Sequence, residues 1–174
     1  GLTPLHSLEL AALNHRVKGT KRRASIAEEG APKDRTGRFL KKPIPVELIR
    51  EGPLLELARR CLPRDNISAI SISRNFSARR HQDTNKGRSH TVVFGDFTGG
   101  GFRLEGWTQP WRETRKWLHY DGSKHHSVDR IKKGVRVSVT AFEEPDRTRA
   151  CAGVFAAEDE DVDEDEDEEV DEDD

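Results

Sequence analysis

A His-x-Asp triplet and a distant histidine are the residues of this sequence whose types and spacing could do chemistry. His81 and Asp83 stand two positions apart, so in an extended segment both side chains point to the same side. His126 follows much later in the chain. Two imidazoles and one carboxylate form the facial ligand set that suits Fe(II) and leaves open positions on the metal. The sequence therefore predicts a catalytic metal site with His81, Asp83 and His126 as ligands.

An arginine beyond the last histidine is the candidate anchor for a co-substrate. A 2-oxo acid can fill two open positions on the iron, and dioxygen can take the third. The far carboxylate of 2-oxoglutarate then needs a fixed cation, and a guanidinium can bind a carboxylate through two parallel hydrogen bonds. Arg136 follows Gly134-Val135, and Ser138 lies on the same face of the expected strand. We predict that Arg136 and Ser138 bind the co-substrate.

Several neighbouring residues have two interpretations. His125 would face the other way from His126 on a strand, as a surface group. Asn85 and Ser89 could cap a turn, or they could orient His81 or Asp83 from behind.

From about Asn75 to Phe142, the sequence resembles the Fe(II)/2-oxoglutarate-dependent dioxygenase superfamily. The residues that carry the resemblance are the His-x-Asp triplet, the distal histidine and the Arg-x-Ser pair: His81, Asp83, His126, Arg136 and Ser138. The resemblance implies a double-stranded β-helix, also called a jelly roll. It also implies Fe(II), 2-oxoglutarate as co-substrate, dioxygen, and hydroxylation of a nucleic-acid base or a protein side chain.

A looser likeness concerns the branch that oxidises thymine and methylcytosine. It rests on the stretches H-x-D-x-N-x-G-x-S from His81, G-D-F-T-G-G from Gly95, and W-x-x-Y-D-G-x-x-x-H from Trp117. This likeness bears on the substrate and implies a nucleic-acid base.

Helices near the N-terminus and strands after them should position these residues. The apolar spacing predicts helices over 4–16, Val46–Arg50 and Leu54–Leu62. Alternation and turn signals predict the following strands: 67–72, Thr91–Phe94, Phe102–Trp107, Lys116–Tyr120 and Gly134–Phe142. Residues 149–157 fit a last strand or a short helix. The fold class is mainly β with N-terminal helices, as a sandwich, a barrel or a jelly roll.

Three segments follow from this pattern. Residues 1–66 form an N-terminal helical and basic segment packing on the core, and 67–157 form the jelly-roll catalytic core. Residues 158–174 are an acidic tail that has almost nothing to bury, so we expect it to be disordered.

The charge distribution suggests an anionic partner. The chain has 174 residues and a net charge of −2, yet all 30 Lys and Arg precede residue 158. Because 15 of the 32 Asp and Glu lie in the tail, residues 1–157 carry a net charge of +13. A body this basic is expected to bind nucleic acid or an anionic protein. The alternative function is a non-enzymatic jelly-roll module that binds anionic partners through its basic face and would not bind Fe(II) or 2-oxoglutarate.

Other features narrow the setting. No run of about 18 apolar residues occurs, so no membrane partner is expected. The two cysteines, Cys61 and Cys151, form neither a disulfide framework nor a zinc pattern. Unpaired thiols favour a reducing intracellular compartment, cytoplasm or nucleus.

Overall fold

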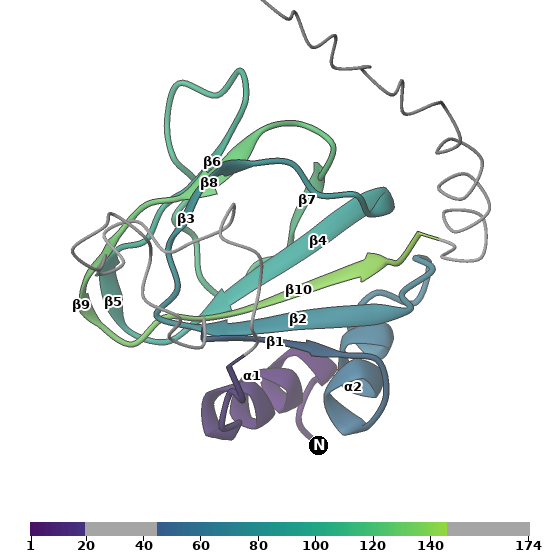
Figure 1. Ribbon diagram of the computed structural model, residues 1–174. Coiled ribbons are helices and arrows are strands. Elements are labelled where there is room, and N and C mark those ends of the chain that lie inside the picture. Colours follow the sequence, from purple (N-terminus) through teal and green to yellow (C-terminus); the bar gives the residue numbers. More distant parts are fainter. Residues whose placement is uncertain (20–44, 146–174) are drawn as a thin grey trace, which may run out of the picture.

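The computed structural model describes residues 1–19 and 45–145 (Figure 1). Residues 20–44 of the N-terminal helical and basic segment, the element expected at 149–157 and the acidic tail lie outside these residues. The described elements are two helices and ten strands: α1 (Pro4–Asn14), β1 (Val46–Ile49), α2 (Pro53–Cys61), β2 (Ala69–Arg74), β3 (Ala78–His81), β4 (Lys86–Phe94), β5 (Phe97–Gly99), β6 (Phe102–Leu104), β7 (Leu118–Asp121), β8 (His126–Val128), β9 (Ile131–Gly134) and β10 (Val137–Glu143). None of these helices is long and apolar enough to cross a membrane.

The strands are antiparallel and form three sheets. Five strands pair in the order β1-β2-β10-β4-β7, three in the order β3-β8-β6, and two as β5-β9. Figure 1 shows α1 and α2 beneath the five-stranded sheet, with β3, β6 and β8 on its other side. The expected class, mainly β with N-terminal helices, is therefore confirmed.

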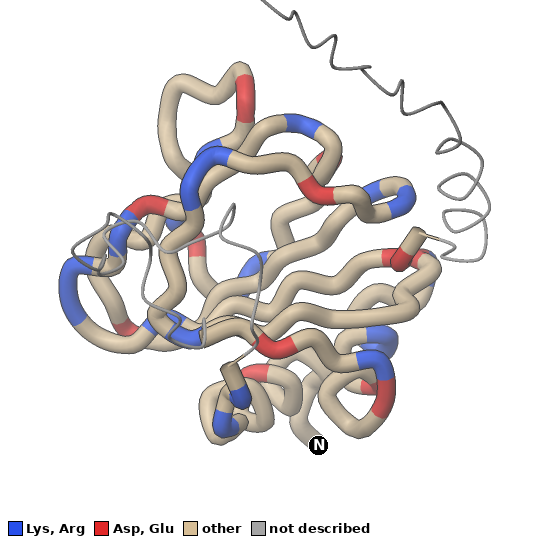
Figure 2. The backbone as a smooth tube through the Cα atoms, in the orientation of Figure 1, with Lys and Arg blue, Asp and Glu red and all other residues tan. Residues whose placement is uncertain are grey.

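The central strands have one apolar face and one polar face. Their apolar side chains pack with α1 and α2 in one core: Ile70, Ile72, Val92, Phe94, Val137, Val139 and Ala141. The intervening positions carry hydroxyl groups on the opposite face: Ser71, Ser73, Thr91, Ser138 and Thr140. This arrangement follows from the period of two of a strand. In Figure 2 these central strands are mostly free of charged residues, which gather in loops and outer strands.

The predicted helix over Val46–Arg50 is wrong. This segment forms β1, whose Val46 lies opposite Ser73 of β2. It is confined between Pro45 and the Gly52-Pro53 start of α2, which is too short for a stable helix turn. Pairing with β2 satisfies its backbone groups instead. A strand from the predicted N-terminal segment therefore belongs to the main sheet.

The strand predicted from Gly134 to Phe142 is two strands. β9 ends at Gly134, whose φ of +83° turns the chain, and β10 begins at Val137. A Cβ on Gly134 would lie 2.1 Å from the carbonyl oxygen of Asp96, so only glycine fits this turn. Arg136 therefore precedes β10 rather than lying within it. The predicted strand from Phe102 also ends early, at Leu104, because a turn bond joins the Trp107 N–H to the Leu104 carbonyl.

His90 of β4 links the sheet to the loop after α2. Its Nδ1 lies 2.6 Å from Nδ1 of His119, and its Nε2 lies 3.5 Å from Asp65. Burial lowers the pKa of His90 below 6.5, and the charges of His119 and Arg88 lower it further, against the opposing charge of Asp65. The unfolded chain therefore takes up a proton near pH 6.5 that folded His90 does not.

The free energy of unfolding should therefore decrease as the pH is lowered through about 6.5. Because the folded pKa lies below the unfolded one, the contribution of His90 is present above pH 6.5 and is lost below it. His90→Gln should flatten this loss in denaturant unfolding between about pH 7.5 and about pH 5.5. His6→Gln, at an exposed position on α1, serves as the control. An unchanged pH slope in His90→Gln would refute the assignment.

Candidate metal centre

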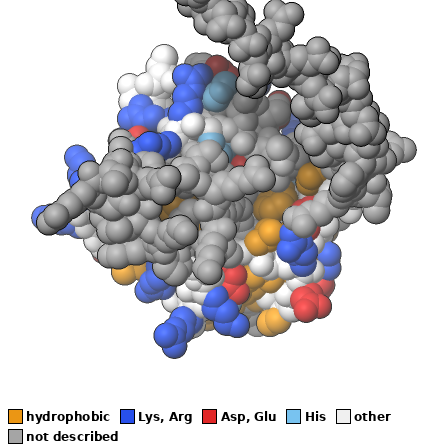
Figure 3. Space-filling view, viewed as in Figure 1, with side chains coloured by type: hydrophobic (Ala, Val, Ile, Leu, Met, Phe, Trp, Pro, Cys, Tyr) orange, Lys and Arg blue, Asp and Glu red, His pale blue; other side chains and the backbone are white. Residues whose placement is uncertain are grey.

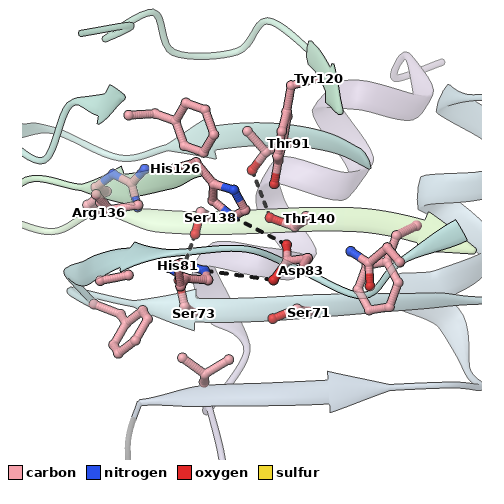
Figure 4. Close-up of a pocket in the computed structure, with 17 residues that line it drawn as sticks. Ser71, Ser73, His81, Asp83, Thr91, Tyr120, His126, Arg136, Ser138 and Thr140 are labelled. Atoms are coloured by element: carbon pink, nitrogen blue, oxygen red, sulfur yellow. Dashed lines mark hydrogen bonds and ion pairs between the residues drawn. The ribbon is translucent and has the colours of Figure 1, made fainter. Parts of the chain in front are cut away.

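Two neighbouring strands bring the three predicted ligands together. His81 ends β3 and His126 begins β8, and the two residues are direct antiparallel partners. Asp83 follows β3, where its backbone N–H donates to the Gly122 carbonyl at 2.8 Å. One donor atom from each of these three side chains lies within 4.8 Å of the others. Figure 4 shows the side chains pointing toward one another.

The distances suit a single metal ion. Nε2 of His81 lies 3.7 Å from Oδ1 of Asp83, and Nε2 of His126 lies 3.3 Å from Oδ2. Metal bonds of about 2.0–2.2 Å at right angles would place neighbouring donor atoms about 3 Å apart. Small side-chain movements would therefore close the ligand set around an ion.

Backbone carbonyls orient both imidazole rings. Nδ1 of His81 lies 2.6 Å from the Arg79 carbonyl, and Nδ1 of His126 lies 2.9 Å from the Lys124 carbonyl. A ring that donates through Nδ1 presents the lone pair of Nε2, which is the usual arrangement of a metal-bound histidine. In both histidines, a hydrogen bond to the carbonyl two residues earlier thus orients the ring toward Asp83.

The pKa of His126 is raised by its surroundings. Burial alone would lower it, but the hydrogen bond to Asp83, the Lys124 carbonyl and the charge of Asp83 together outweigh burial. The carboxylate thus already interacts with the ring that it would join at a metal.

A hydroxyl and an amide bond to each other near the loop that carries Asp83. Asn85 donates to Ser89 at 3.1 Å. A Cβ on Gly122 would lie 2.9 Å from the Ser89 hydroxyl and 3.4 Å from Cβ of Asp83. A larger residue at position 122 would therefore require the Ser89 side chain to shift. Ser89 and Asp83 thus both lie close to Gly122, and the two interpretations of Asn85 and Ser89 both stay open.

Aromatic rings fix His126 on its other side. Phe102 stacks on it with ring centroids 5.6 Å apart and an interplanar angle of 25°. Tyr120 packs against it at 5.4 Å. Burial and the charge of Asp83 raise the pKa of Tyr120 far above its usual value, so its phenol stays protonated. The ring of His126 has little freedom to turn.

The His-Asp-His cluster faces a cavity with a floor of hydroxyl groups. Its volume is about 110 Å³, whereas one water needs about 10–15 Å³ in the same measure, so a small organic anion fits. Ser73 and Ser138 are opposite each other and hydrogen-bonded at 2.6 Å. Thr91 and Thr140 lie 2.9 Å apart in the next row. Figure 4 shows this floor on the strands beneath the ligands.

Arg136 lines the same cavity as a buried cation. It is 3% exposed, and its guanidinium forms neither an ion pair nor a hydrogen bond with the described residues. Burial lowers the pKa of Arg136 to about 10, so it is charged at neutral pH. Leaving a buried charge without a partner is costly. An anion in the cavity would offset this cost at Arg136.

The β5–β9 pair and the loop after β5 cover this arginine. The guanidinium carbon lies 5.8 Å from the ring centroid of Phe97. Gly100 has a φ of +62°, and a Cβ there would lie 2.8 Å from Cδ of Arg136. Glycine at position 100 thus leaves room for the Arg136 side chain.

Sequence reasoning missed the hydroxyls beside Ser138 and the role of Phe102. The signal for the former was present, since Ser71, Ser73 and Thr140 alternate with apolar residues in their strands. Without the pairing of β2, β10 and β4 they could not be assigned to one surface. His125, expected at the surface, is half exposed and lies 3.6 Å from Glu105.

Comparisons with known proteins give weak structural similarity over about half of the chain. No family model and no curated protein matches the chain. One solved structure is NgTET1 in complex with 5mC DNA, with a TM-score of 0.40 and 16% identity over 49% of this chain and 41% of that chain. Another is a 2OG-Fe(II) oxygenase family oxidoreductase from Burkholderia pseudomallei, with a TM-score of 0.39 and 17% identity over 53% and 50%. The chain matches half or less of each, and similarity at this level assigns no activity.

Proposed function

We propose that the protein is an Fe(II)- and 2-oxoglutarate-dependent dioxygenase. The observation that carries the proposal is the combination found in one cavity. A His-Asp-His cluster there has both rings oriented by backbone carbonyls, and a buried arginine lacks an anionic partner among the described residues. A metal site alone would fit many functions, and a buried cation alone would fit many anions. Together they match a metal-chelating dicarboxylate.

We propose a double-stranded β-helix for the fold. The five-stranded sheet and the β3-β8-β6 sheet are both antiparallel, and residues of both line the cavity between them. The metal cluster comes from the smaller sheet and the hydroxyl floor from the larger one. Two packed sheets with a site between them are the arrangement that a jelly roll provides.

Each residue has a defined task in this proposal. His81, Asp83 and His126 would hold Fe(II) on one face. Arg136 would bind the far carboxylate of 2-oxoglutarate with two parallel hydrogen bonds, and the Ser138 hydroxyl would add a third. The rings of Phe102 and Tyr120 restrict water beside His126.

The iron supplies the redox chemistry when it is bound. Dioxygen and 2-oxoglutarate are consumed, succinate and carbon dioxide are released, and one oxygen atom is inserted into a C–H bond of the substrate. The chain itself would orient the co-substrate. It also keeps Arg136 charged and buried, and solvent and salt screen the attraction of a buried cation for an anion least.

Charges near the metal ligands favour nucleic acid over a protein side chain as substrate. Arg79 and Arg80 immediately precede His81, and Lys124 lies just before His126. All three side chains are exposed, although Arg80 pairs with Glu105 at 2.9 Å. Figure 3 shows Lys and Arg side chains beside histidines on this face. Such cations bind a phosphate backbone, while the base to be oxidised must leave its stack to reach the metal.

The test is a turnover assay with oligonucleotides. The protein is incubated with Fe(II), 2-oxoglutarate and air, together with single-stranded or duplex DNA, and succinate and the gain of one oxygen atom by a base are followed. We expect both products to require iron. Binding of DNA without conversion of 2-oxoglutarate, under any of these conditions, would contradict the proposal and support the non-enzymatic binding module.

A further inference from the structure

Asn75 lies at the point where the chain leaves the five-stranded sheet and runs toward β3. It follows Arg74, the last residue of β2, which pairs with Val137 at the start of β10. Beyond Asn75 the chain leaves the main sheet and crosses to β3, which carries His81. The residue opposite Asn75 is Arg136. One position thus borders both the segment that leads to the metal ligands and the anchor cation.

Three hydrogen bonds connect Asn75 to the segment that carries the anchor. Its backbone N–H donates to the Arg136 carbonyl at 2.8 Å. Its side-chain Oδ1 accepts from the Arg136 N–H at 2.7 Å, and its Nδ2 donates to the Gly134 carbonyl at 3.3 Å. Asn75 is exposed, so these bonds, and not burial in the core, are its main contribution to the structure.

The side chain replaces a missing bond of the sheet. Residues in a hydrogen-bonded antiparallel pair exchange two N–H···O=C bonds. Asn75 and Arg136 make one of them, but the other goes to Oδ1 instead of the Asn75 carbonyl. The φ of Asn75 is +49°, a left-handed conformation that asparagine tolerates better than most residues. The chain can therefore turn toward β3 while Arg136 stays hydrogen-bonded as if the strand continued.

The opposite side of the anchor segment is also fixed. The Val135 N–H donates to the Asp96 carbonyl at 2.8 Å. A Cβ on Gly95 would lie 2.1 Å from the Val135 carbonyl oxygen, so the two chains are in close backbone contact. Hydrogen bonds to Asn75 on one side and contacts with Gly95 and Asp96 on the other thus hold the backbone around Arg136 in place.

We propose that Asn75 is a positioning residue for the Arg136 anchor. It sets where the guanidinium enters the cavity and thereby the affinity for the far carboxylate of 2-oxoglutarate, without touching the co-substrate or the metal ligands. The inference rests on the proposed function, because it presupposes that 2-oxoglutarate binds at Arg136.

The test separates the hydrogen bond from the backbone conformation. Asn75→Gly keeps the left-handed φ accessible but removes the acceptor for the Arg136 N–H. Asn75→Asp keeps an acceptor oxygen for the Arg136 N–H, replaces the donor to Gly134 by a second oxygen and adds a negative charge. Asn66→Gly, an exposed asparagine in the loop after α2, controls for a general effect of adding glycine. Each full-length protein is titrated first with Mn(II) and then with 2-oxoglutarate in a calorimeter.

We expect Asn75→Gly to bind 2-oxoglutarate about tenfold more weakly, the effect of losing one hydrogen bond, with unchanged affinity for Mn(II). Asn75→Asp should lie within about threefold of the wild type, and Asn66→Gly should match it. In turnover, Asn75→Gly should raise the KM for 2-oxoglutarate and leave kcat at saturating 2-oxoglutarate unchanged.

Two results would overturn the inference. One is wild-type affinity for 2-oxoglutarate in Asn75→Gly. The other is a parallel loss of Mn(II) affinity, which would mean that Asn75 supports the fold of the whole site. A wild-type protein that binds Mn(II) and no 2-oxoglutarate would instead refute the proposed function itself, and this inference with it.

Discussion

Replacing Asp83 by alanine should weaken binding of Fe(II) or Mn(II) by more than about a hundredfold and abolish conversion of 2-oxoglutarate. Removing a group that merely supports a ligand already costs about 10–100-fold in metal affinity, and Asp83 is the only carboxylate in the described cluster. Its loss would leave two neutral imidazoles, which hold a divalent ion weakly. Metal titration followed by calorimetry measures the effect.

Asp129→Ala provides the matched control. Asp129 is another half-buried carboxylate, but it pairs with Arg103 at 2.7 Å instead of facing the histidines. Its loss should leave metal affinity unchanged. If Asp83→Ala remained folded and kept the wild-type metal affinity, His81, Asp83 and His126 would not be the metal site.

Replacing Arg136 by methionine should have two opposite effects. The variant should bind 2-oxoglutarate at least about a hundredfold more weakly. A buried guanidinium, which binds a carboxylate through two parallel hydrogen bonds, is the strongest available partner for it. The ligand-free protein should nevertheless become more stable by about 1–4 kcal/mol, because a buried charge that has no partner among residues 1–19 and 45–145 is replaced by an apolar side chain of similar length. Denaturant unfolding without ligand and calorimetry with Mn(II) measure the two effects.

Two further variants sharpen the comparison. Arg136→Lys keeps the positive charge but cannot form two parallel hydrogen bonds to a carboxylate. Its affinity for 2-oxoglutarate should therefore lie between those of the wild type and Arg136→Met. Arg103→Met removes an exposed arginine and should change neither quantity by much. A destabilised Arg136→Met that still bound 2-oxoglutarate would show that this arginine serves the fold and not the ligand.

The grouping of His81, Asp83 and His126 was predictable because its signal is local. His81 and Asp83 share a face in any extended segment, and His126 is recognised by its distance from an arginine. The apolar alternation of Val137 and Val139 likewise predicted which face of β10 meets the core, and the structure confirms it. Such patterns need no knowledge of which strands are neighbours.

The surroundings of Arg136 could not be predicted in this way. Its burial depends on Phe97 of β5 and on Gly100 just after β5, and its backbone position depends on Asn75. Position 136 read as part of a regular strand because Val135 continues the alternation, whereas the contact of Gly134 with Asp96 breaks the strand there. Contacts between segments distant in sequence decide these points.

The structure of β1 also depends on a contact between segments that are distant in sequence. Its four residues have no clear preference of their own, and pairing with β2 makes them a strand. The cavity floor depends on pairing too, since Ser73 and Ser138 meet only through the register of β2 and β10.

The most direct test of the proposed site is the visible spectrum of the protein with Fe(II) and 2-oxoglutarate in the absence of oxygen. We expect a weak charge-transfer band in the wild type. It should be absent in His126→Ala, which lacks a metal ligand, and in Arg136→Met at the same 2-oxoglutarate concentration. No band in folded, iron-loaded wild-type protein at saturating 2-oxoglutarate would contradict the account, and the basic-face binding module would then explain the chain better.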